Sequence, residues 1–305
     1  MKKQILSILD VEDEIEAIID RGIQLKHEMK AGKKRDLFKG KTLAMLFERA
    51  STRTRVSFEV GMTLLGGHAI FLSKDEVGIG KRESAEDVAL VLSRYVDVIM
   101  YRALRSDDLQ QLAAHATVPV INGLDRHEHP CQILADFMTV KEKKGKLKGL
   151  HFTFIGDGDD NLAHSYLLGG PCVGMDVTII SPKNYWPQEE FIKKAQQNAE
   201  KHHRSITITD DLGAVKTADV VATDTWISLW FENERLKRLQ DLHQYTVTPL
   251  VMKDAKEDAI FLHCMPIYYG EEVTRDVAHG PQSVIIDEAE NRLWAQNALL
   301  ERLLR

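Results

Sequence analysis

The chain of 305 residues has only three cysteines, Cys131, Cys172 and Cys264. So sparse and odd a set predicts no disulfide framework and favours a reducing compartment. No run approaches the roughly 20 apolar residues needed to span a bilayer. The start of the chain meets acidic residues from Asp10 onward, before an apolar core of signal-peptide length can form. We therefore expect a cytoplasmic protein with no membrane segment.

Positive charge is in slight deficit. The 40 lysines and arginines face 46 aspartates and glutamates, which gives a formal net charge of -6 with neutral histidines. This balance argues against a nucleic-acid-binding protein, whose binding domain is usually basic. An anionic small molecule stays open as a ligand, because a site depends on local charge and not on the total. Composition is otherwise that of a globular protein, and the length predicts about two domains.

Apolar runs alternate with helical patterns along the whole chain. This alternation predicts an α/β fold with two domains, each an open parallel sheet flanked by helices. Helices are expected at residues 11–29, 58–65, 84–95 (with Ser84 as its cap) and 293–305, and the charged stretch 141–149 marks the expected domain boundary. The expected strands are residues 41–48, 68–72, 96–101, 118–122, 151–155, 176–181, 205–209, 220–223, 259–263 and 283–286.

Residues that follow the expected strands are the candidate site residues, since ligands of open α/β sheets bind beyond the carboxyl ends of the strands. The strand 41–48 is followed by the sequence Ser-Thr-Arg-Thr-Arg at 51–55, where a helix begins. Free N–H groups and the helix dipole favour an anion there, and arginine offers phosphate a bidentate fork. The alternative is a serine cap with a solvated basic first turn, although that dipole prefers acidic residues. The pattern favours a phosphate site.

Two more strand ends in the first half carry polar side chains. Arg102 follows the strand 96–101, where a lone arginine is more often a surface charge. Beyond the strand 118–122, the sequence His-Pro-Cys-Gln at 129–132 opens a helix and could hold a carbonyl group through an imidazole and an amide. The spacing of His127 and His129, without a matched second ligand pair, is weak evidence for a metal site.

The strand ends of the second half offer groups that suit an amine. Residues 156–161 begin like the dinucleotide fingerprint G-x-G-x-x-G but end on Asn161, so a nicotinamide oxidoreductase is a weak alternative. Asp224 and Ser228 follow the strand 220–223 and suit an ammonium group or an amino acid. Cys264 follows the strand 259–263, and a small buried hydrophobe is its alternative role. Trp226, in the same loop as Asp224, has core packing as its alternative. A phosphate-bearing donor in one half and an amine in the other predict a group transfer.

Three of these motifs, residues 51–55 (STRTR), 129–132 (HPCQ) and 263–266 (HCMP), resemble the signatures of the aspartate/ornithine carbamoyltransferase family. The resemblance extends over nearly the whole chain, and Cys131 favours the ornithine-using members over the aspartate-using ones. It implies transfer of the carbamoyl group of carbamoyl phosphate to the side-chain amine of L-ornithine, giving L-citrulline and phosphate. No metal or organic cofactor is implied.

The resemblance also implies a domain plan and an assembly. Residues 1–145 would bind carbamoyl phosphate and residues 146–288 would bind ornithine, with a helix at 289–305 returning to the first domain. A homotrimer is implied, with a loop lent by the neighbouring subunit, as is a place in arginine biosynthesis. The implied site has catalytic residues (Arg53, Arg102, His129, Cys264), residues for carbamoyl phosphate (Ser51, Thr52, Arg53, Thr54, Arg102, His129, Gln132, Cys264, Met265, Arg292) and residues for ornithine (Asn161, Asp224, Ser228, Leu229).

Three departures from the family pattern bear on the substrate. Leu229 and Trp230 stand where the family usually has methionine and glycine, so a bulky ring replaces a residue without a side chain. Gly78 stands where the loop lent by the neighbour usually carries glutamine, and Asp160 precedes Asn161 where the family has two asparagines. The alternatives are therefore a carbamoyltransferase for another amine, such as putrescine, or a non-catalytic relative.

Overall fold

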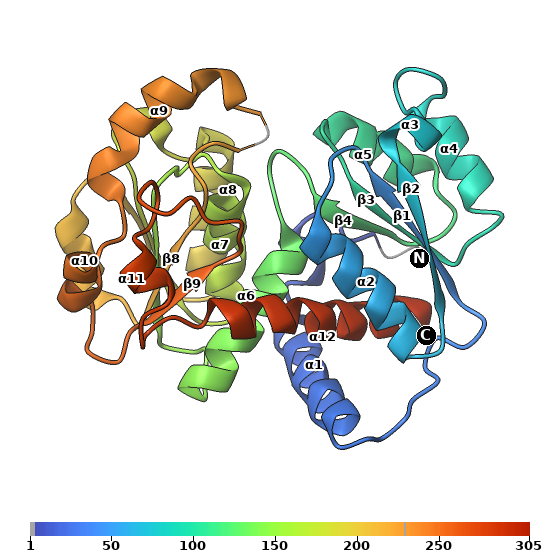
Figure 1. Ribbon diagram of the computed structural model, residues 1–305, viewed down its shortest axis with the longest axis horizontal. Helices are drawn as coiled ribbons and strands as arrows, with labels where there is room; N and C mark the ends of the chain where they lie inside the picture. The colour runs from blue at the N-terminus through green and yellow to red at the C-terminus, as the bar shows by residue number, and fades with distance from the viewer. Residues whose placement is uncertain (1–3, 229) are drawn as a thin grey trace. The chain divides into compact units, whose positions relative to one another are not determined.

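The computed structural model describes residues 4–228 and 230–305 and divides them into two compact units. The first unit contains the described residues through Met138 together with Ala289–Arg305, and the second contains Thr139–Glu288. Each unit is built around a parallel sheet flanked by helices (Figure 1). The predicted fold class is thus confirmed. Among the described residues, no helix is both long and apolar enough to cross a membrane.

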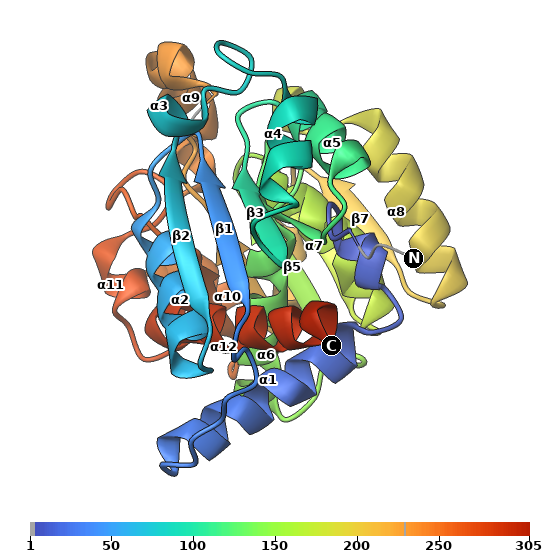
Figure 2. The same ribbon diagram turned by 90° about the vertical axis from the view of Figure 1, so that its right-hand side faces the viewer.

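The first unit has a four-stranded sheet in the order β2-β1-β3-β4, with β2 at one edge (Figure 2). All its strands are parallel. The central strands are almost fully buried because helices cover both faces, which explains their continuous apolar runs. Their bounds are β1 Thr42–Phe47, β2 His68–Ser73, β3 Val98–Arg102 and β4 Val120–Leu124.

Two helices of the first unit, α2 and α4, begin after a serine whose side chain caps them. Ser84, the predicted cap, accepts a hydrogen bond from the Asp87 N–H at 3.0 Å, as the rule for N-cap serines requires. The bounds are η1 Ile8–Val11, α1 Ile15–Lys30, α2 Thr52–Leu64, α3 Lys74–Val77, α4 Ala85–Leu92, α5 Ser106–His115, α6 Pro130–Lys144 and α12 Ile285–Leu304, of which α6 and α12 extend into the second unit.

The second unit has a five-stranded parallel sheet in the order β7-β6-β5-β8-β9. Its strands are β5 His151–Ile155, β6 Asp176–Ile180, β7 Ile206–Thr209, β8 Val220–Thr223 and β9 Ile260–His263. Its helices are α7 Asn161–Cys172, η2 Lys183–Tyr185, α8 Glu189–Lys201, η3 Leu212–Thr217, η4 Glu232–Glu234, α9 Arg235–Leu242, η5 His243–Tyr245, α10 Pro249–Asp254 and α11 Arg275–Ala278.

The strand predicted at residues 283–286 was wrong. Ser283 makes only an isolated bridge to Phe261, and α12 already begins at Ile285. The β-branched run Val-Ile-Ile favoured a strand, but Asp287 and Glu288 follow it and stabilise the positive end of a helix. Ile285 is buried and Ile286 is exposed, as successive positions of an amphipathic helix are. The C-terminal helix is therefore longer than the predicted 293–305.

Both sheets reverse their strand order once. In the first unit the chain passes from β1 to β2 on one side and then returns to place β3 on the other side of β1. In the second unit, β6 and β7 lie on one side of β5, and β8 and β9 on the other. Such a reversal leaves a crevice at the carboxyl ends of the two strands that flank it, here β1 with β3 and β5 with β8. Candidate residues follow these four strands and their neighbours β4 and β9.

Candidate active site

Three strand ends meet in the first unit. Phe47, at the end of β1, is in register with Arg102, at the end of β3, and Arg102 is in register with Leu124 of β4. A register shift lies between Tyr101 and Arg102, and Leu124 has a φ of 132°, so the strands leave regular geometry here. Residues rarely adopt such a φ unless the surroundings hold them in it, and functional sites are a common place for it.

The predicted phosphate turn is the first turn of α2. Ser51 is the N-cap, and its Oγ accepts a hydrogen bond from the Thr54 N–H at 3.4 Å. The serine-cap interpretation is therefore correct, but it accounts for one of several N–H groups at this end. Arg53 is half-buried, Thr54 is buried and Thr52 is exposed. A basic helix start with further N–H groups and hydroxyls fits a phosphate.

His129 lies among three arginines. Its side chain is only 4% exposed. Burial, and after it the positive charges of Arg292, Arg102 and Arg53, hold the pKa of His129 well below its usual range. The imidazole is therefore neutral at physiological pH and can donate one hydrogen bond while it accepts another. The structure brings together these four residues, which come from four different parts of the chain.

Arg292 joins α12 to the phosphate turn. Its Nη2 donates to Thr54 Oγ1 at 3.1 Å, and its Nη1 donates to Gln132 Oε1 at 2.6 Å. Gln132 Nε2 in turn donates to Asp136 Oδ1 at 2.8 Å, which fixes the orientation of the amide. Asp136 was missed in the sequence analysis, although its position four residues after Gln132 on a helix places the two side chains on one face.

Cys131 is a structural residue. It is completely buried, its Sγ lies 3.5 Å from the Asn122 carbonyl oxygen, and burial raises the pKa of its thiol to about 12. A thiol in this state is neither a thiolate nucleophile nor a metal ligand at neutral pH. Within residues 4–228 and 230–305, neither His127 nor His129 belongs to a group of three possible metal ligands.

In the second unit, the loops after β8 and β9 bring Asp224 and Cys264 together. The thiol of Cys264 donates to Asp224 Oδ1 at 3.2 Å, and the same oxygen accepts the Thr225 N–H at 2.7 Å. Asp224 is 8% exposed, and its burial raises the pKa of the carboxyl. A cationic ligand here would favour the ionised carboxylate.

A buried His-Glu pair supports the Cys264 turn. His263 Nδ1 accepts the Met265 N–H at 2.8 Å, so its Nε2 carries the proton and donates to Glu272 Oε1 at 3.1 Å. Met265 is half-buried, has a φ of 60° and precedes a cis peptide bond to Pro266. Glu272 was missed because no pattern in the sequence relates it to residues 263–265.

Asn161 is the first residue of α7, and its buried side-chain oxygen Oδ1 is a hydrogen-bond acceptor that no described residue uses. It is 4% exposed, and its Oδ1 has no hydrogen-bond partner among the described residues. A buried amide oxygen usually has a partner, so a ligand that donates a hydrogen bond is the natural one here. Asp160 is the N-cap of the helix and accepts the Leu162 N–H at 2.8 Å. Aspartate and asparagine cap helices about equally well, so this departure keeps its local function.

The turn Gly156-Asp157-Gly158 has structural reasons for its residues. Gly156 has a φ of 135°, and a Cβ on Gly158 would lie 2.7 Å from the Tyr185 carbonyl oxygen. Asp157 forms a buried ion pair with Arg238. The glycines therefore match the partial fingerprint through local geometry and close packing, and no dinucleotide is needed to explain them.

The loop after Asp224 is held in place by the packing of Trp226 and by contacts of Arg238. Trp226 is buried in a small cluster, which agrees with the core-packing interpretation. Arg238 donates to its carbonyl oxygen at 3.3 Å and stacks on the Phe231 ring with 3.6 Å between Cζ and the ring centroid. Ser228 and Trp230 are half-buried, and Leu229 lies outside the described residues.

Gly78 ends α3 in the left-handed region, with a φ of 66°. A Cβ there would also lie 3.0 Å from Arg82 Cβ. Glycine adopts this conformation without the steric cost that glutamine would have. The departure from the family pattern at this position is thus explained by the backbone of the turn.

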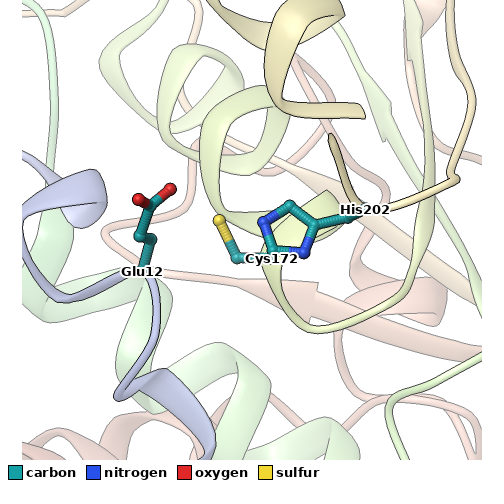
Figure 3. Close-up of side chains that lie close together, drawn as sticks. All are labelled: Glu12, Cys172 and His202. Atoms are coloured by element: carbon teal, nitrogen blue, oxygen red, sulfur yellow. The ribbon is translucent and has the colours of Figure 1, made fainter. Parts of the chain in front are cut away.

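Outside these strand ends, Cys172 and His202 lie next to each other at the ends of α7 and α8 (Figure 3). Their possible ligand atoms are within 4.8 Å of each other, and Asn198 Nδ2 donates to Cys172 Sγ at 3.0 Å. Two ligand atoms fall short of the four that a structural zinc site requires. We assign this pair no functional role.

Known proteins match the chain along its length. Residues 3–142 match the family described as aspartate/ornithine carbamoyltransferase, carbamoyl-P binding domain, and residues 148–303 match the Asp/Orn binding domain of the same family. An ornithine carbamoyltransferase from Methanoculleus marisnigri is 46% identical over 100% of this chain and 97% of its own. The structure of the ornithine carbamoyltransferase from Pyrococcus furiosus is 46% identical, with a TM-score of 0.94 over 98% of this chain and 96% of its own. That from Thermus thermophilus is 39% identical, with a TM-score of 0.88 and full coverage of both chains. The chain therefore belongs to the aspartate/ornithine carbamoyltransferase family.

Proposed function

We propose that this protein is a transferase that moves the carbamoyl group of carbamoyl phosphate to the side-chain amine of L-ornithine, with L-citrulline and phosphate as products. The observation that carries the proposal is the convergence of Arg53, Arg102, His129 and Arg292 on the capped start of α2. Relatives that are 46% identical over nearly the full length of the chain bear the name ornithine carbamoyltransferase, which supports ornithine as the amine.

In this proposal the first unit binds the donor. The N–H groups of Ser51 and Thr52, the Thr54 hydroxyl and the side chain of Arg53 hold the phosphate end, because a helix start with arginine suits a dianion. Arg292 adds a second guanidinium from α12. Arg102, neutral His129 and Gln132 hold the carbamoyl end, where hydrogen-bond donors stabilise the charge that develops on the carbonyl oxygen. The predicted domain 1–145, completed by the helix 289–305, has this role.

The second unit binds the acceptor. Asp224 and the unpartnered Oδ1 of Asn161 suit the α-ammonium group of an amino acid, and Ser228 and Leu229 complete the predicted set. Cys264 and Met265 would meet the carbamoyl end of the donor through their main chain. The predicted domain 146–288 has this role, and closure around both ligands would exclude the water that hydrolyses the donor.

The reaction needs a neutral amine. Alkylamines titrate near the lysine value of about 10.4, so most ornithine is protonated at neutral pH and the site must select or generate the neutral form. The amine nitrogen attacks the carbamoyl carbon and a C–N bond forms. The C–O bond to phosphate breaks, and the phosphate leaves with the electron pair. The proton lost by the amine goes to the leaving phosphate, because the Cys264 thiol keeps its own proton and donates it to Asp224.

An assay with four amines tests the substrate. Carbamoyl phosphate is supplied with ornithine, putrescine, N-acetylornithine or lysine, and the carbamoylated product is measured. We expect ornithine to give the highest kcat/KM. A preference for putrescine would instead support the alternative raised by Trp230, and a Trp230→Gly variant would then be expected to shift the preference toward ornithine. No product with any amine would identify a non-catalytic relative.

The proposed assembly is a homotrimer. Three apolar side chains at helical spacing on α2, Val56, Val60 and Leu64, are 51%, 40% and 39% exposed, and Ile70 on the edge strand β2 is 38% exposed. Exposed apolar side chains gathered on one helix face often mark protein contacts. Sedimentation equilibrium tests it, because a Val60→Asp variant should dissociate. A cytoplasmic location and a place in arginine biosynthesis accompany the proposal.

A further inference from the structure

A buried row of polar side chains lies between α2 and α12 in the first unit, where the two helices cross (Figure 1). On α2 the row consists of Thr54 and Ser57, and Gly61 lies one turn further along the same face, since the three positions are three and four residues apart. A Cβ on Gly61 would lie 2.2 Å from Asn297 Oδ1, so the helices are very close at that point. The α12 members of the row are Arg292, Gln296 and Asn297, and each is 2% exposed or less.

Gln296 connects Arg292 on α12 to Ser57 on α2. With its amide oxygen toward Arg292, Gln296 accepts from Arg292 Nη2 at 2.8 Å and from Arg292 Nε at 3.1 Å. Its amide nitrogen then donates to Ser57 Oγ at 2.7 Å and to the Arg292 carbonyl oxygen at 3.2 Å. The Ser57 hydroxyl donates to the Thr54 carbonyl oxygen at 3.2 Å. This orientation gives both amide atoms of Gln296 hydrogen-bond partners, which is how amide orientations are assigned.

The Arg292 guanidinium is thereby fixed by two neutral amides. Gln132 accepts from Nη1 and Gln296 accepts from Nη2 and Nε, so the planar group is held on two sides. A carboxylate in the same place would neutralise the positive charge, whereas an amide leaves that charge available to an anion. A long side chain that is ordered before binding also loses less conformational entropy when its ligand arrives.

We propose that Gln296 is a positioning residue, which holds the Arg292 guanidinium against the first turn of α2 and leaves its charge for the phosphate of the donor. The inference rests on the proposed function, since it presumes that Arg292 serves the phosphate site. Gln296 itself touches neither substrate. Its effect passes through Arg292 and through Ser57, one turn beyond the phosphate-binding residues.

The first test is a Gln296→Met variant, which keeps the length of the side chain and removes both amide atoms. We expect the Kd for inorganic phosphate, measured by calorimetry, and the KM for carbamoyl phosphate to rise about tenfold, the ratio that corresponds to a lost hydrogen bond to a charged group. The KM for ornithine should stay within twofold. Phosphate affinity equal to that of the wild type would overturn the inference.

Asn297→Ala is the matched control on the same helix. Asn297 is completely buried, and neither of its amide atoms has a hydrogen-bond partner among the described residues, so the variant perturbs the same helix contact without touching Arg292. Phosphate affinity should be unchanged. A loss equal to that of Gln296→Met would overturn the inference, because helix packing alone would then explain both.

A Gln296→Glu variant decides the matter if the methionine variant fails to fold. Glutamate has the same shape and still accepts from Arg292, but its charge neutralises the guanidinium. We expect a larger loss of phosphate affinity than for methionine, and wild-type affinity would overturn the inference. A wild-type protein that binds no phosphate would instead refute the proposed function, so the two failures are distinguishable.

Discussion

Arg292 and Gln132 are 160 positions apart in the sequence, yet Arg292 Nη1 donates to Gln132 Oε1 at 2.6 Å. The contact depends on α12, whose residues after Glu288 belong to the first unit although the second unit precedes them in the chain. The proposed phosphate site is therefore assembled from both ends of the sequence. Truncating α12 would remove a side chain from the site as well as helix packing.

The account predicts that Arg53 is required for turnover. An Arg53→Ala variant should lose two to three orders of magnitude in kcat/KM, on the order of the loss seen when one preorganised charge-stabilising donor is removed. Its melting temperature should change little, because Arg53 is half-buried at the start of a helix. Steady-state kinetics and thermal melting provide the measurement.

Arg55→Ala is the comparison for that variant. Arg55 lies in the same turn, but it pairs with Glu59 at 3.3 Å and stacks on Phe71 with 3.9 Å between Cζ and the ring centroid. Its loss of kcat/KM should be far smaller than that of Arg53→Ala. Equal losses in the two variants would mean that the phosphate responds to the positive charge of the whole turn and not to a direct contact with the Arg53 guanidinium.

A second prediction separates the two half-sites by kinetics. Cys264→Ala removes the thiol that donates to Asp224 Oδ1 and leaves that buried oxygen with one fewer donor. The KM for ornithine should rise about tenfold, the ratio for a lost hydrogen bond to a charged group. The Kd for inorganic phosphate should stay at the wild-type value. A parallel rise in that Kd would contradict the assignment of the Cys264 thiol, as distinct from its main chain, to the acceptor side.

A third prediction concerns the protonation of His129. Its pKa is held well below the ordinary value by burial and three arginines, so the imidazole stays neutral as the pH falls from 8 to 6. Its ¹⁵N chemical shifts should therefore be constant over this range, with the resonances assigned by their absence in a His129→Asn variant. A titration midpoint near 6.5 would show that the arginines do not act on this ring as described.

Much of this arrangement could be predicted from the sequence, because strand ends and helix starts are local features. The capped turn at Ser51 and the turn at Cys264 follow apolar runs that are readable without a structure. The prediction of a strand at 283–286 was wrong because the β-branched run was given more weight than Asp287 and Glu288, the acidic residues in the first turn of α12. Glu272 and Gln296 could not be found, because their partners are set by packing between elements and not by spacing.

A fourth prediction comes from a carboxyl group beside the site. Glu128 precedes His129, accepts the Ile8 N–H at 3.0 Å and is buried, and this burial raises its pKa to about 8 from the ordinary 4.5. The folded protein thus holds a proton that the unfolded chain releases above pH 4.5. Stability from this group is present below that pH and is lost as the pH rises toward 8.

Glu128→Gln should therefore be less sensitive to alkali than the wild type. The amide can still accept the Ile8 N–H, and it has no charge to bury. At pH 8.5 its melting temperature should exceed that of the wild type by about 3 °C or more, which corresponds to roughly 1 kcal/mol for a protein of this class. At pH 5 the difference should be smaller. The exposed Glu257→Gln variant is the control, and the same gain there would contradict the assignment.

The most direct test of the central claim follows the carbamoyl group itself. Purified protein is given carbamoyl phosphate labelled with ¹⁴C in the carbamoyl carbon, with and without L-ornithine, and labelled citrulline and free phosphate are both measured. Above the hydrolysis measured without protein, we expect the two products to appear in equal amounts and only when the amine is present. Phosphate release without labelled citrulline, or no turnover at saturating concentrations of both substrates, would contradict it.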